Sequence, residues 1–231
     1  MRLFYRKYEK KIMKTSTTKP FYTSINFLIS MLLLLPFGVL AFGVAQQSEW
    51  LNSFDRFFAS PILVNRSPIK TTFYSLITDL GGTFCIFLLT VLVSLYFIWR
   101  KKDTKTAYWF IFNVALGAGL LNQLVKFLFQ RTRPTIEHLV LQDGYSFPSG
   151  HSMASLICYG GIAFLIIQFT RKKWIKWVVG LLASLIIITI GISRIYLGVH
   201  FPSDVIGGFC LAGSWLLLST AFYSNKIRNH H

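Results

Sequence analysis

Six long apolar stretches constrain this chain more than any other feature of its sequence. A helix that crosses a bilayer needs about 20 predominantly apolar residues. The stretches are separated by short polar connections and run over residues 23–46, 82–99, 107–129, 152–170, 177–195 and 204–223. No alternating strand pattern competes with them. The sequence therefore predicts an all-α integral membrane protein, built as a six-transmembrane-helix bundle.

The composition supports the same class. Of the 231 residues, 53% are apolar and only 14% are charged, whereas a soluble domain has about 25% charged residues. We expect a single domain over residues 1–231 that begins with a basic tail at residues 1–22. The three cysteines fall inside apolar stretches, so we expect small buried side chains rather than disulfides or metal ligands. They are Cys85, Cys158 and Cys210.

The net charge of +16 raises the question of a nucleic-acid partner, but the distribution of the charge argues against one. Lysines and arginines gather in the N-terminal tail and in the connections 100–106 and 171–176. Basic loops of membrane proteins face the cytoplasm. Both termini are therefore predicted to be cytoplasmic, which leaves residues 47–81, 130–151 and 196–203 on the outer side.

The first outer connection is too polar to cross the membrane, yet its aromatic residues recur at helical spacing. We expect an interfacial helix on the outer face, between spans one and two. Two roles are open for it, a lipid access route and a cap on the bundle. Its aromatic residues are Trp50, Phe54, Phe57 and Phe58. Asp79, near the start of the second span, is a functional candidate without an assigned role.

The first cluster of ionisable groups lies at the outer end of the third span, in the segment KFLFQRTRP. Lys126 and Arg133 are seven residues apart, which is two helical turns, so both cations can project from one face. Pro134 biases Arg133 out of the helical conformation at the exit of the helix. Snorkelling to the interface is an alternative explanation for Lys126.

The second cluster is FPSGHSM, just before the fourth span. Ser149, Gly150 and His151 should form the first turn of a helix, whose free N–H groups and dipole favour a phosphate. Gly150 lets the backbone approach a ligand closely. A plain helix cap by Ser149 explains the serine and the glycine equally well, but it does not explain the histidine.

The third cluster is SRIYLGVHFPSDVIGG, between the fifth and sixth spans. Arg194 lies at the outer end of the fifth span, and Asp204 follows His200 by four residues. Helical spacing would place the carboxylate beside the imidazole, where it can hold one ring N–H and leave the other nitrogen basic. An activated nucleophile needs this arrangement. A purely structural His–Asp cap is the alternative.

All three clusters belong to the outer ends of spans three to six, so helix packing can bring them together. The combined site would hold three cations, a helix N-terminus and two histidines, with one obvious carboxylate. Such a site suits a phosphate and does not suit a divalent metal, which takes several oxygen ligands. We therefore expect chemistry that needs neither a metal nor another cofactor.

The three motifs resemble those of the type 2 phosphatidic acid phosphatases. Residues 126–134 match K-x6-R-P, residues 148–151 match P-S-G-H, and residues 193–204 match S-R-x5-H-x3-D. The resemblance covers about residues 72–223, the motif-bearing core. It implies that His200 attacks phosphorus, that Asp204 orients His200, and that His151 protonates the leaving group. It also implies a set of phosphate-binding residues, namely Lys126, Arg133, Ser149, Gly150 and Arg194.

The resemblance further implies a phosphatase of a bacterial cytoplasmic membrane. The positions of the basic loops predict that its active site faces outside, and the donor set predicts that it needs no metal. We expect it to hydrolyse a lipid phosphomonoester of the phosphatidylglycerol phosphate type through a phosphohistidine intermediate. Undecaprenyl diphosphate is the alternative substrate, and a lipid-phosphate transporter or phosphotransferase is a further alternative. The expected partners are the lipid bilayer and a phosphorylated or diphosphorylated lipid. His230 and His231 are left out of this mechanism.

Overall fold

The computed structural model describes residues 19–228 and the side chains of residues 25–224. Two π-helical segments continue the α-helices: η2 (Tyr96–Arg100) follows α5, and η3 (Ala115–Leu121) joins α6 to α7. The described α-helices are α2 (Lys19–Ala45), α3 (Glu49–Val64), α4 (Pro68–Asp79), α5 (Thr83–Leu95), α6 (Thr104–Val114), α7 (Asn122–Phe129), α8 (Gly150–Phe169), α9 (Lys173–Tyr196) and α10 (Pro202–Arg228). Most of the predicted basic tail, residues 1–18, lies outside the described residues, as do His230 and His231.

The six predicted spans are confirmed in the described part of the chain. Each expected apolar stretch coincides, to within a few residues, with a helix or helical run that is long and apolar enough to cross a membrane. Those spans are Ile25–Ala45, Thr83–Arg100, Thr104–Phe129, Gly150–Phe169, Lys173–Tyr196 and Pro202–Ser224. The all-α bundle predicted from hydropathy is therefore the observed architecture.

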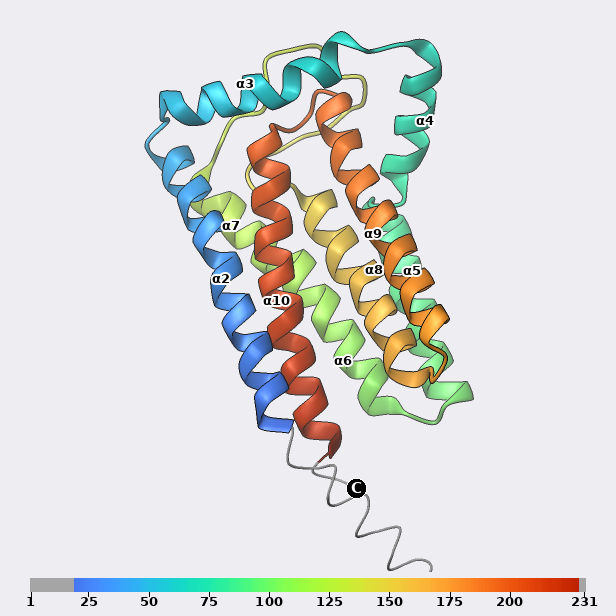
Figure 1. Ribbon diagram of the computed structural model, residues 1–231. Helices are drawn as coiled ribbons and strands as arrows, with labels where there is room; N and C mark the ends of the chain where they lie inside the picture. Colours follow the sequence, from blue (N-terminus) through green and yellow to red (C-terminus); the bar gives the residue numbers. More distant parts are fainter. Residues whose placement is uncertain (1–18, 229–231) are drawn as a thin grey trace, which may run out of the picture.

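Figure 1 shows how the spans are arranged. Helix α8 lies inside the bundle and packs against α5, α6, η3, α9 and α10, while α2 runs alongside α10. The α5–α6 and α8–α9 connections lie at one end, together with the described ends of the chain. Helix α3 and the long 130–149 loop lie at the other end. All three candidate clusters are found at this second end.

Helix α8 can be central because apolar side chains occur on all of its faces and its serines are buried. Met153, Ile157 and Leu165 are buried, and they belong to one core cluster with Phe110 of α6. The third span turns two of its polar side chains inward: Asn113 and Asn122 are buried, whereas Gln123 is exposed.

The connection between the first two spans, predicted to form one interfacial helix, forms two helices. Pro68 is the first residue of α4, where its missing N–H costs nothing, so the chain turns at residues 65–67 before the second helix begins. Arg66 fixes this turn by donating from Nε to the carbonyl oxygen of Tyr196, at 3.0 Å. Helix α4 then packs against α9, while α3 lies across the end of the bundle (Figure 1).

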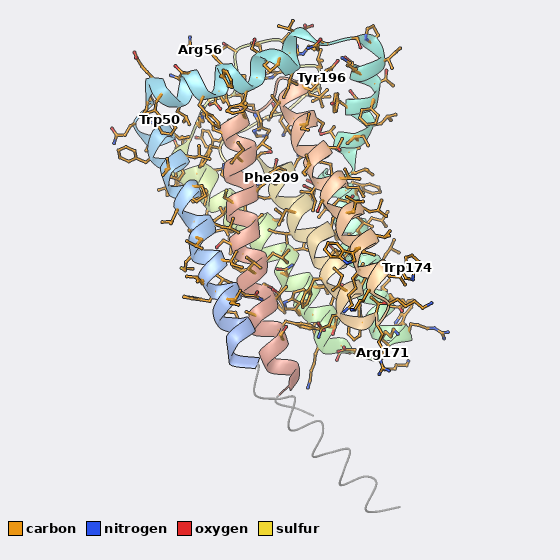
Figure 2. The ribbon with its side chains drawn as sticks, in the orientation of Figure 1. Trp50, Arg56, Arg171, Trp174, Tyr196 and Phe209 are labelled. Carbon is orange, nitrogen blue, oxygen red and sulfur yellow. The ribbon has the colours of Figure 1, made fainter. Side chains whose placement is uncertain are left out.

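Helix α3 has one face toward the bundle and one face away from it. Trp50, Phe57 and Phe58 are exposed, as an interfacial helix requires, whereas Leu51 and Asp55 are buried against the bundle. Figure 2 shows Trp50 on this helix. The helix therefore combines an exposed aromatic surface with the capping role that the sequence left open.

Candidate active site

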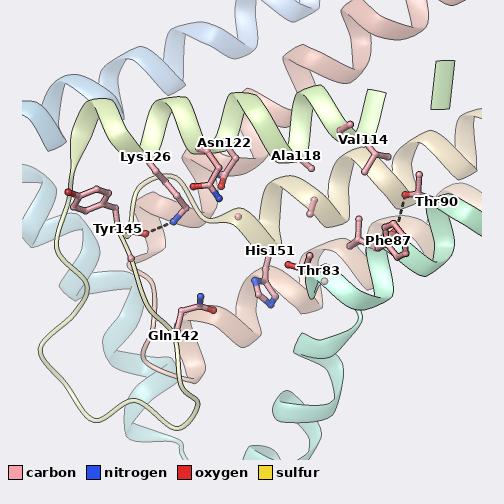
Figure 3. Close-up of a pocket in the computed structure, with 18 of the residues that line it drawn as sticks. Thr83, Phe87, Thr90, Val114, Ala118, Asn122, Lys126, Gln142, Tyr145 and His151 are labelled. Atoms are coloured by element: carbon pink, nitrogen blue, oxygen red, sulfur yellow. Dashed lines mark hydrogen bonds between the residues drawn. The ribbon is translucent and has the colours of Figure 1, made fainter. Parts of the chain in front are cut away.

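The three sequence clusters meet around one cavity, of about 850 Å³, at the α3 end of the bundle. Its polar end is lined by Lys126, Arg133, Gly150, His151 and His200. Figure 3 shows Lys126 and His151 at this end, with Tyr145 and Gln142 of the long loop beside them. Residues of all three motifs, from the third span, the fourth span and the α9–α10 connection, therefore line one cavity.

The first turn of α8 forms as expected. Ser149 is the N-cap of the helix, and its Oγ accepts hydrogen bonds from Ser152 N at 3.4 Å and from Ser152 Oγ at 3.0 Å. The amides of Gly150 and His151 begin the helix and have no intrahelical acceptor, so they are free to face an anion. A Cβ atom at Gly150 would lie 3.2 Å from Asn122 Oδ1. Ser149 therefore acts as a structural cap, and its phosphate-binding role stays a prediction.

His200 and Asp204 form the predicted pair. His200 Nδ1 lies 3.4 Å from Asp204 Oδ2 and 3.4 Å from Ser146 Oγ, while Nε2 lies 3.3 Å from Arg133 Nη1. A guanidinium can only donate, so Nε2 must carry the lone pair and Nδ1 the proton. Burial is the main cause that lowers the pKa of His200, to about 3, so the ring is neutral at physiological pH. A nucleophilic histidine needs this tautomer, in which Nε2 carries no proton.

Asp204 lies in the first turn of α10, where a carboxylate is favoured by the helix dipole. Its Oδ2 accepts from the backbone N–H of Phe201 at 2.8 Å and from the hydroxyl of Ser146. Its Oδ1 accepts from Arg131 Nη1 at 2.7 Å. The side chain is fully buried, and donors surround both oxygens. This carboxylate is therefore held in one orientation beside His200.

Lys126 and Arg133 reach the same cavity, but not in the way that their spacing suggested. The prediction of two helical turns between them is wrong, because α7 ends at Phe129 and Gln130 adopts a left-handed conformation, with φ of 43°. Arg133 instead stands on the extended loop that follows. Lys126 Nζ donates to the carbonyl of Tyr145 (Figure 3). The two cations thus meet through the folding of the loop.

Backbone carbonyl groups of the long loop and of the α9–α10 connection hold Arg133. Arg133 donates from Nε to Gly144 O at 2.9 Å, from Nη2 to Asp143 O at 2.8 Å, and from Nη1 to Val199 O at 2.7 Å. Burial lowers the pKa of Arg133 below its usual value, and Asp204 is the main opposing charge. A phosphate oxygen at this site would compete with neutral carbonyls, which accept less strongly than an anion.

Arg194 is almost completely buried at the end of α9. Its Nη1 donates to Thr78 Oγ1 at 2.8 Å and its Nη2 to Gln142 Oε1 at 2.5 Å. Its Nε is buried and has no hydrogen-bond partner among the described residues. Leaving a buried donor unpaired costs about 1–3 kcal/mol. An acceptor supplied by a ligand would remove that cost.

His151 differs from His200 in its surroundings. The ring lines the cavity from the first turn of α8, and it makes no side-chain hydrogen bond to any residue that the structure describes. Its Cδ2 atom lies 3.4 Å from the position that a Cβ atom on Gly81 would take. The ring therefore contacts the turn between α4 and α5 and leaves its nitrogens to the cavity or a ligand.

Several residues at the site are not predicted by the sequence motifs. They come from α3, α4 and the long loop, and they are Asp55, Thr78, Arg131, Gln142 and Ser146. Arg131 lies inside the K-x6-R-P motif, at a position where the motif allows any residue. Its place in the motif is the sequence feature that could have indicated a role at the site. Asp79 is exposed at the end of α4, whereas its neighbour Thr78 contacts Arg194.

The donor set of the site suits an anion. Within residues 25–224, no three histidine, cysteine, aspartate or glutamate side chains gather in a way that could hold a metal ion. Both oxygens of Asp204 already accept from protein donors, so few lone pairs remain for a cation. The described cysteines are free thiols. The geometry offers positive charge, N–H donors and one neutral imidazole to a ligand.

Known proteins share both the sequence and the fold. The profile described as "PAP2 superfamily" matches residues 107–228. The chain is 32% identical to phosphatidylglycerophosphatase B of Bacillus subtilis over 193 residues, which cover 82% of this chain and 92% of that protein. It is also 32% identical to the undecaprenyl-diphosphatase of Sulfolobus acidocaldarius over 130 residues, which cover 55% of this chain and 57% of the relative.

Two solved structures have the same fold. One is described as the first transmembrane PAP2-type phosphatidylglycerolphosphate phosphatase from Bacillus subtilis. It matches with a TM-score of 0.79 and 29% identity, and the match covers 85% of this chain and 96% of that one. The other, Aquifex aeolicus LpxE, matches with a TM-score of 0.53 and 28% identity, covering 73% of this chain and 93% of that one.

Proposed function

This chain belongs to the PAP2 superfamily, and on that premise we propose that it hydrolyses a lipid phosphomonoester of the phosphatidylglycerol phosphate type at the outer face of a bacterial cytoplasmic membrane. The family and its relatives make it a multi-pass membrane lipid phosphatase. The resemblance of the motifs to this family, and within it to bacterial phosphatidylglycerophosphatase B, is thereby confirmed. The substrate, the orientation and the residue roles are the proposal.

The observation that carries the proposal is the shape of the cavity. From its polar end, the cavity continues along the spans between α5 and the α6–η3 segment, where its lining is apolar. Figure 3 shows this course from Lys126 and His151 toward Phe87, Ala118 and Val114. A phosphate can lie at the cationic end while a hydrocarbon chain follows the apolar part. This arrangement suits a phosphorylated lipid better than a soluble phosphate ester.

The first chemical step follows from the tautomer of His200. The phosphoryl group would lie among Lys126, Arg133, Arg194 and the first amides of α8, which offset the charge of its equatorial oxygens. His200 Nε2 attacks phosphorus, and the bond from phosphorus to the lipid oxygen breaks. Asp204 stabilises the proton on Nδ1 as the ring becomes positive. A phosphohistidine and a lipid alkoxide result.

His151 would complete both halves of the reaction. In the first step, protonated His151 transfers its proton to the lipid alkoxide, which leaves as an alcohol. In the second step, neutral His151 takes a proton from water as the water oxygen attacks phosphorus. The bond between phosphorus and His200 Nε2 breaks, and inorganic phosphate is released. General acid–base catalysis of this kind contributes about 10²–10⁴-fold in rate.

The positions of the basic loops support an outward-facing site. Lys101 and Lys102 lie in the α5–α6 connection, and Arg171 and Lys172 in the α8–α9 connection, at the end of the bundle opposite α3. Figure 2 shows Arg171 at that end and Arg56 on α3 at the other. By the positive-inside rule, these positions support an orientation with the basic end and both termini in the cytoplasm and the cavity toward the outside.

Undecaprenyl diphosphate remains the second candidate substrate, because a relative named for that activity matches the chain. The match to phosphatidylglycerophosphatase B covers much more of both chains. We therefore favour the phosphomonoester. The same phosphohistidine would also serve transfer to an acceptor other than water.

The purified full-length protein should release inorganic phosphate from a panel of lipids in mixed micelles. We expect phosphatidylglycerol phosphate to be hydrolysed faster than phosphatidic acid or undecaprenyl diphosphate, and the rate to persist in excess chelator, because cations of the protein bind the phosphate. His200→Ala should abolish release, because the variant lacks the imidazole Nε2 that is proposed to attack phosphorus.

The matched control is His138→Ala. His138 lies on the 130–149 loop, where its Nε2 donates to the carbonyl oxygen of Pro134 at 2.8 Å, and it does not line the cavity. This variant should keep the wild-type rate. Wild-type turnover by His200→Ala would refute the nucleophile, and inactivation by chelator would refute the metal-free mechanism. Preferred hydrolysis of the diphosphate would replace the proposed substrate with the second candidate.

A further inference from the structure

A second network of charged side chains contacts Asp204, and it has no role in the proposed chemical steps. Its centre is Arg131, whose side chain is only 11% exposed. Arg131 Nη1 donates to Asp204 Oδ1 at 2.7 Å, and Nη2 donates to Asp55 Oδ2 of α3 at 2.7 Å. One guanidinium therefore bridges the carboxylate of the proposed catalytic pair to a carboxylate on the helix that covers the site.

Arg131 is held in this position from several sides. Its Nη1 also donates to Ser203 Oγ at 2.7 Å, and its guanidinium carbon lies 4.1 Å from the centre of the Phe201 ring. Its own carbonyl accepts from the backbone N–H of Ser146, whose hydroxyl donates to Asp204. A side chain with so many partners has lost most of its rotamer freedom. Its contact with Asp204 is therefore preorganised.

Asp55 connects the network to α10. Its Oδ1 accepts from the backbone N–H of Ser203 at 2.8 Å, and its Oδ2 accepts from Ser203 Oγ at 2.8 Å. Ser203 is the second residue of α10, so Asp55 satisfies a free N–H of the same helix turn that carries Asp204. Burial raises the pKa of Asp55, while Arg131 and Ser203 oppose that rise. The charge of Asp55 therefore depends on Arg131.

The position of Asp204 decides where His200 points. The contact between Asp204 Oδ2 and His200 Nδ1 is 3.4 Å, so a small rotation of the carboxylate would lose it. Arg131 holds the other oxygen, Oδ1, and prevents that rotation. A lysine could supply the charge, but a single ammonium lacks the planar fork that contacts two carboxylates at once.

We propose that Arg131 and Asp55 are positioning residues of the phosphatase reaction, which together hold Asp204 in the orientation that aims His200 Nε2 at the substrate phosphorus. This inference rests on the proposed function. It assigns α3 a role in the chemical step in addition to covering the bundle. Neither residue contacts the cavity around the phosphate site, so both act through Asp204.

The test measures kcat and KM for each variant with the lipid substrate, per amount of folded protein recovered as a single peak in size-exclusion chromatography. Arg131→Gln should lower kcat by about 10- to 100-fold and change KM less than about threefold. Losses of this size are typical when a residue that orients an active-site side chain by a hydrogen bond is removed. Arg131→Lys should lie between this variant and the wild type. Asp55→Asn should lower kcat by a smaller factor.

A double-mutant cycle distinguishes two roles for Asp55: positioning Asp204 through Arg131, and only holding α3 against the bundle. If Asp55 acts through Arg131, Asp55→Asn should cost nothing more in kcat when Arg131 is already Gln. Glu49→Gln, a matched change on an exposed acid of the same helix, should leave kcat unchanged. Thermal unfolding in detergent reports the structural effect of each variant separately.

The outcomes are distinct. A wild-type kcat per folded protein in Arg131→Gln, with only the unfolding temperature lowered, would overturn the inference and leave the proposed function intact. Fully additive effects of the two substitutions on kcat would overturn the role of Asp55. Failure of the wild-type protein to release phosphate from any lipid would instead refute the proposed function.

Discussion

At the scale of single residues, the two histidines of the site are distinguished by their partners. His200 is buried against Asp204 and Ser146, which fix its proton on Nδ1. His151 has no such partner among the described residues and lines the cavity from the start of α8. A nucleophile needs a fixed tautomer, whereas an acid that later acts as a base must gain and lose a proton. The two environments match the two proposed roles.

The role of His151 as an acid predicts a dependence on the leaving group. With a lipid substrate, His151→Ala should lower kcat by about 10²–10⁴-fold, because the alkoxide cannot leave without a proton. With an aryl phosphate such as p-nitrophenyl phosphate, whose phenolate leaves unaided, the loss in the burst of phenolate release should be much smaller. Rapid-quench kinetics measure this burst. A loss of equal size with both substrates would contradict the assignment.

At the scale of elements, the site depends on how closely α10 approaches the start of α8. A Cβ atom on Gly208 would lie 3.0 Å from the carbonyl oxygen of Ser149, which is a backbone atom and cannot rotate away. The backbone N–H of Ser149 in turn donates to the carbonyl of Asp204 at 3.0 Å. Glycine at position 208 therefore lets the helix of Asp204 contact the helix of His151.

This contact predicts that Gly208→Val separates the two helices. Overpacking of this kind costs about 1–3 kcal/mol of stability, and the displaced histidines should also reduce kcat. Thermal unfolding in detergent and phosphate release measure the two effects. Gly180→Ala is the matched control, because no atom lies within 4 Å of a Cβ there. Wild-type stability and activity in Gly208→Val would show that the contact has no such role.

At the scale of the whole molecule, the bundle separates two chemically different ends. One end carries α3, the long loop and the site, and the other carries the basic connections (Figure 1). The spans between them expose large apolar side chains, such as Phe84, Trp177 and Leu181, as a lipid environment requires. In the proposed function, this polarity would let a substrate lipid stay in the bilayer while its phosphate reaches the site.

The proposed orientation predicts opposite labelling of two engineered cysteines in intact bacterial cells. Leu141→Cys, at a fully exposed position of the long loop, should react with a membrane-impermeant maleimide. Lys102→Cys, in the α5–α6 connection, should react only after the membrane is permeabilised. The unmodified chain measures the background from its own three cysteines. The reverse pattern of labelling would overturn the orientation.

The sequence by itself determined the six spans, the ends of the spans at which the three motifs lie, and the residues that these motifs share with the family. These features are local, because apolar length sets a span and a motif is a run of neighbouring residues. Ser149 as a helix cap, and Asp204 in the first turn of its helix, could be predicted for the same reason. The way in which Lys126 and Arg133 reach the same cavity could not be predicted, because no simple sequence rule predicts the left-handed conformation of the residue that follows α7.

Only the tertiary structure decided which distant residues complete the site. Arg131 bridges Asp55 and Asp204, from which it is separated by 76 and 73 residues along the chain. Thr78 reaches Arg194 across 116 residues. No periodicity or spacing encodes such pairs, because each depends on how the helices pack and on where the long loop crosses the end of the bundle. Burial then makes these pairings specific, since a buried charge must find a partner and only folding brings that partner within reach.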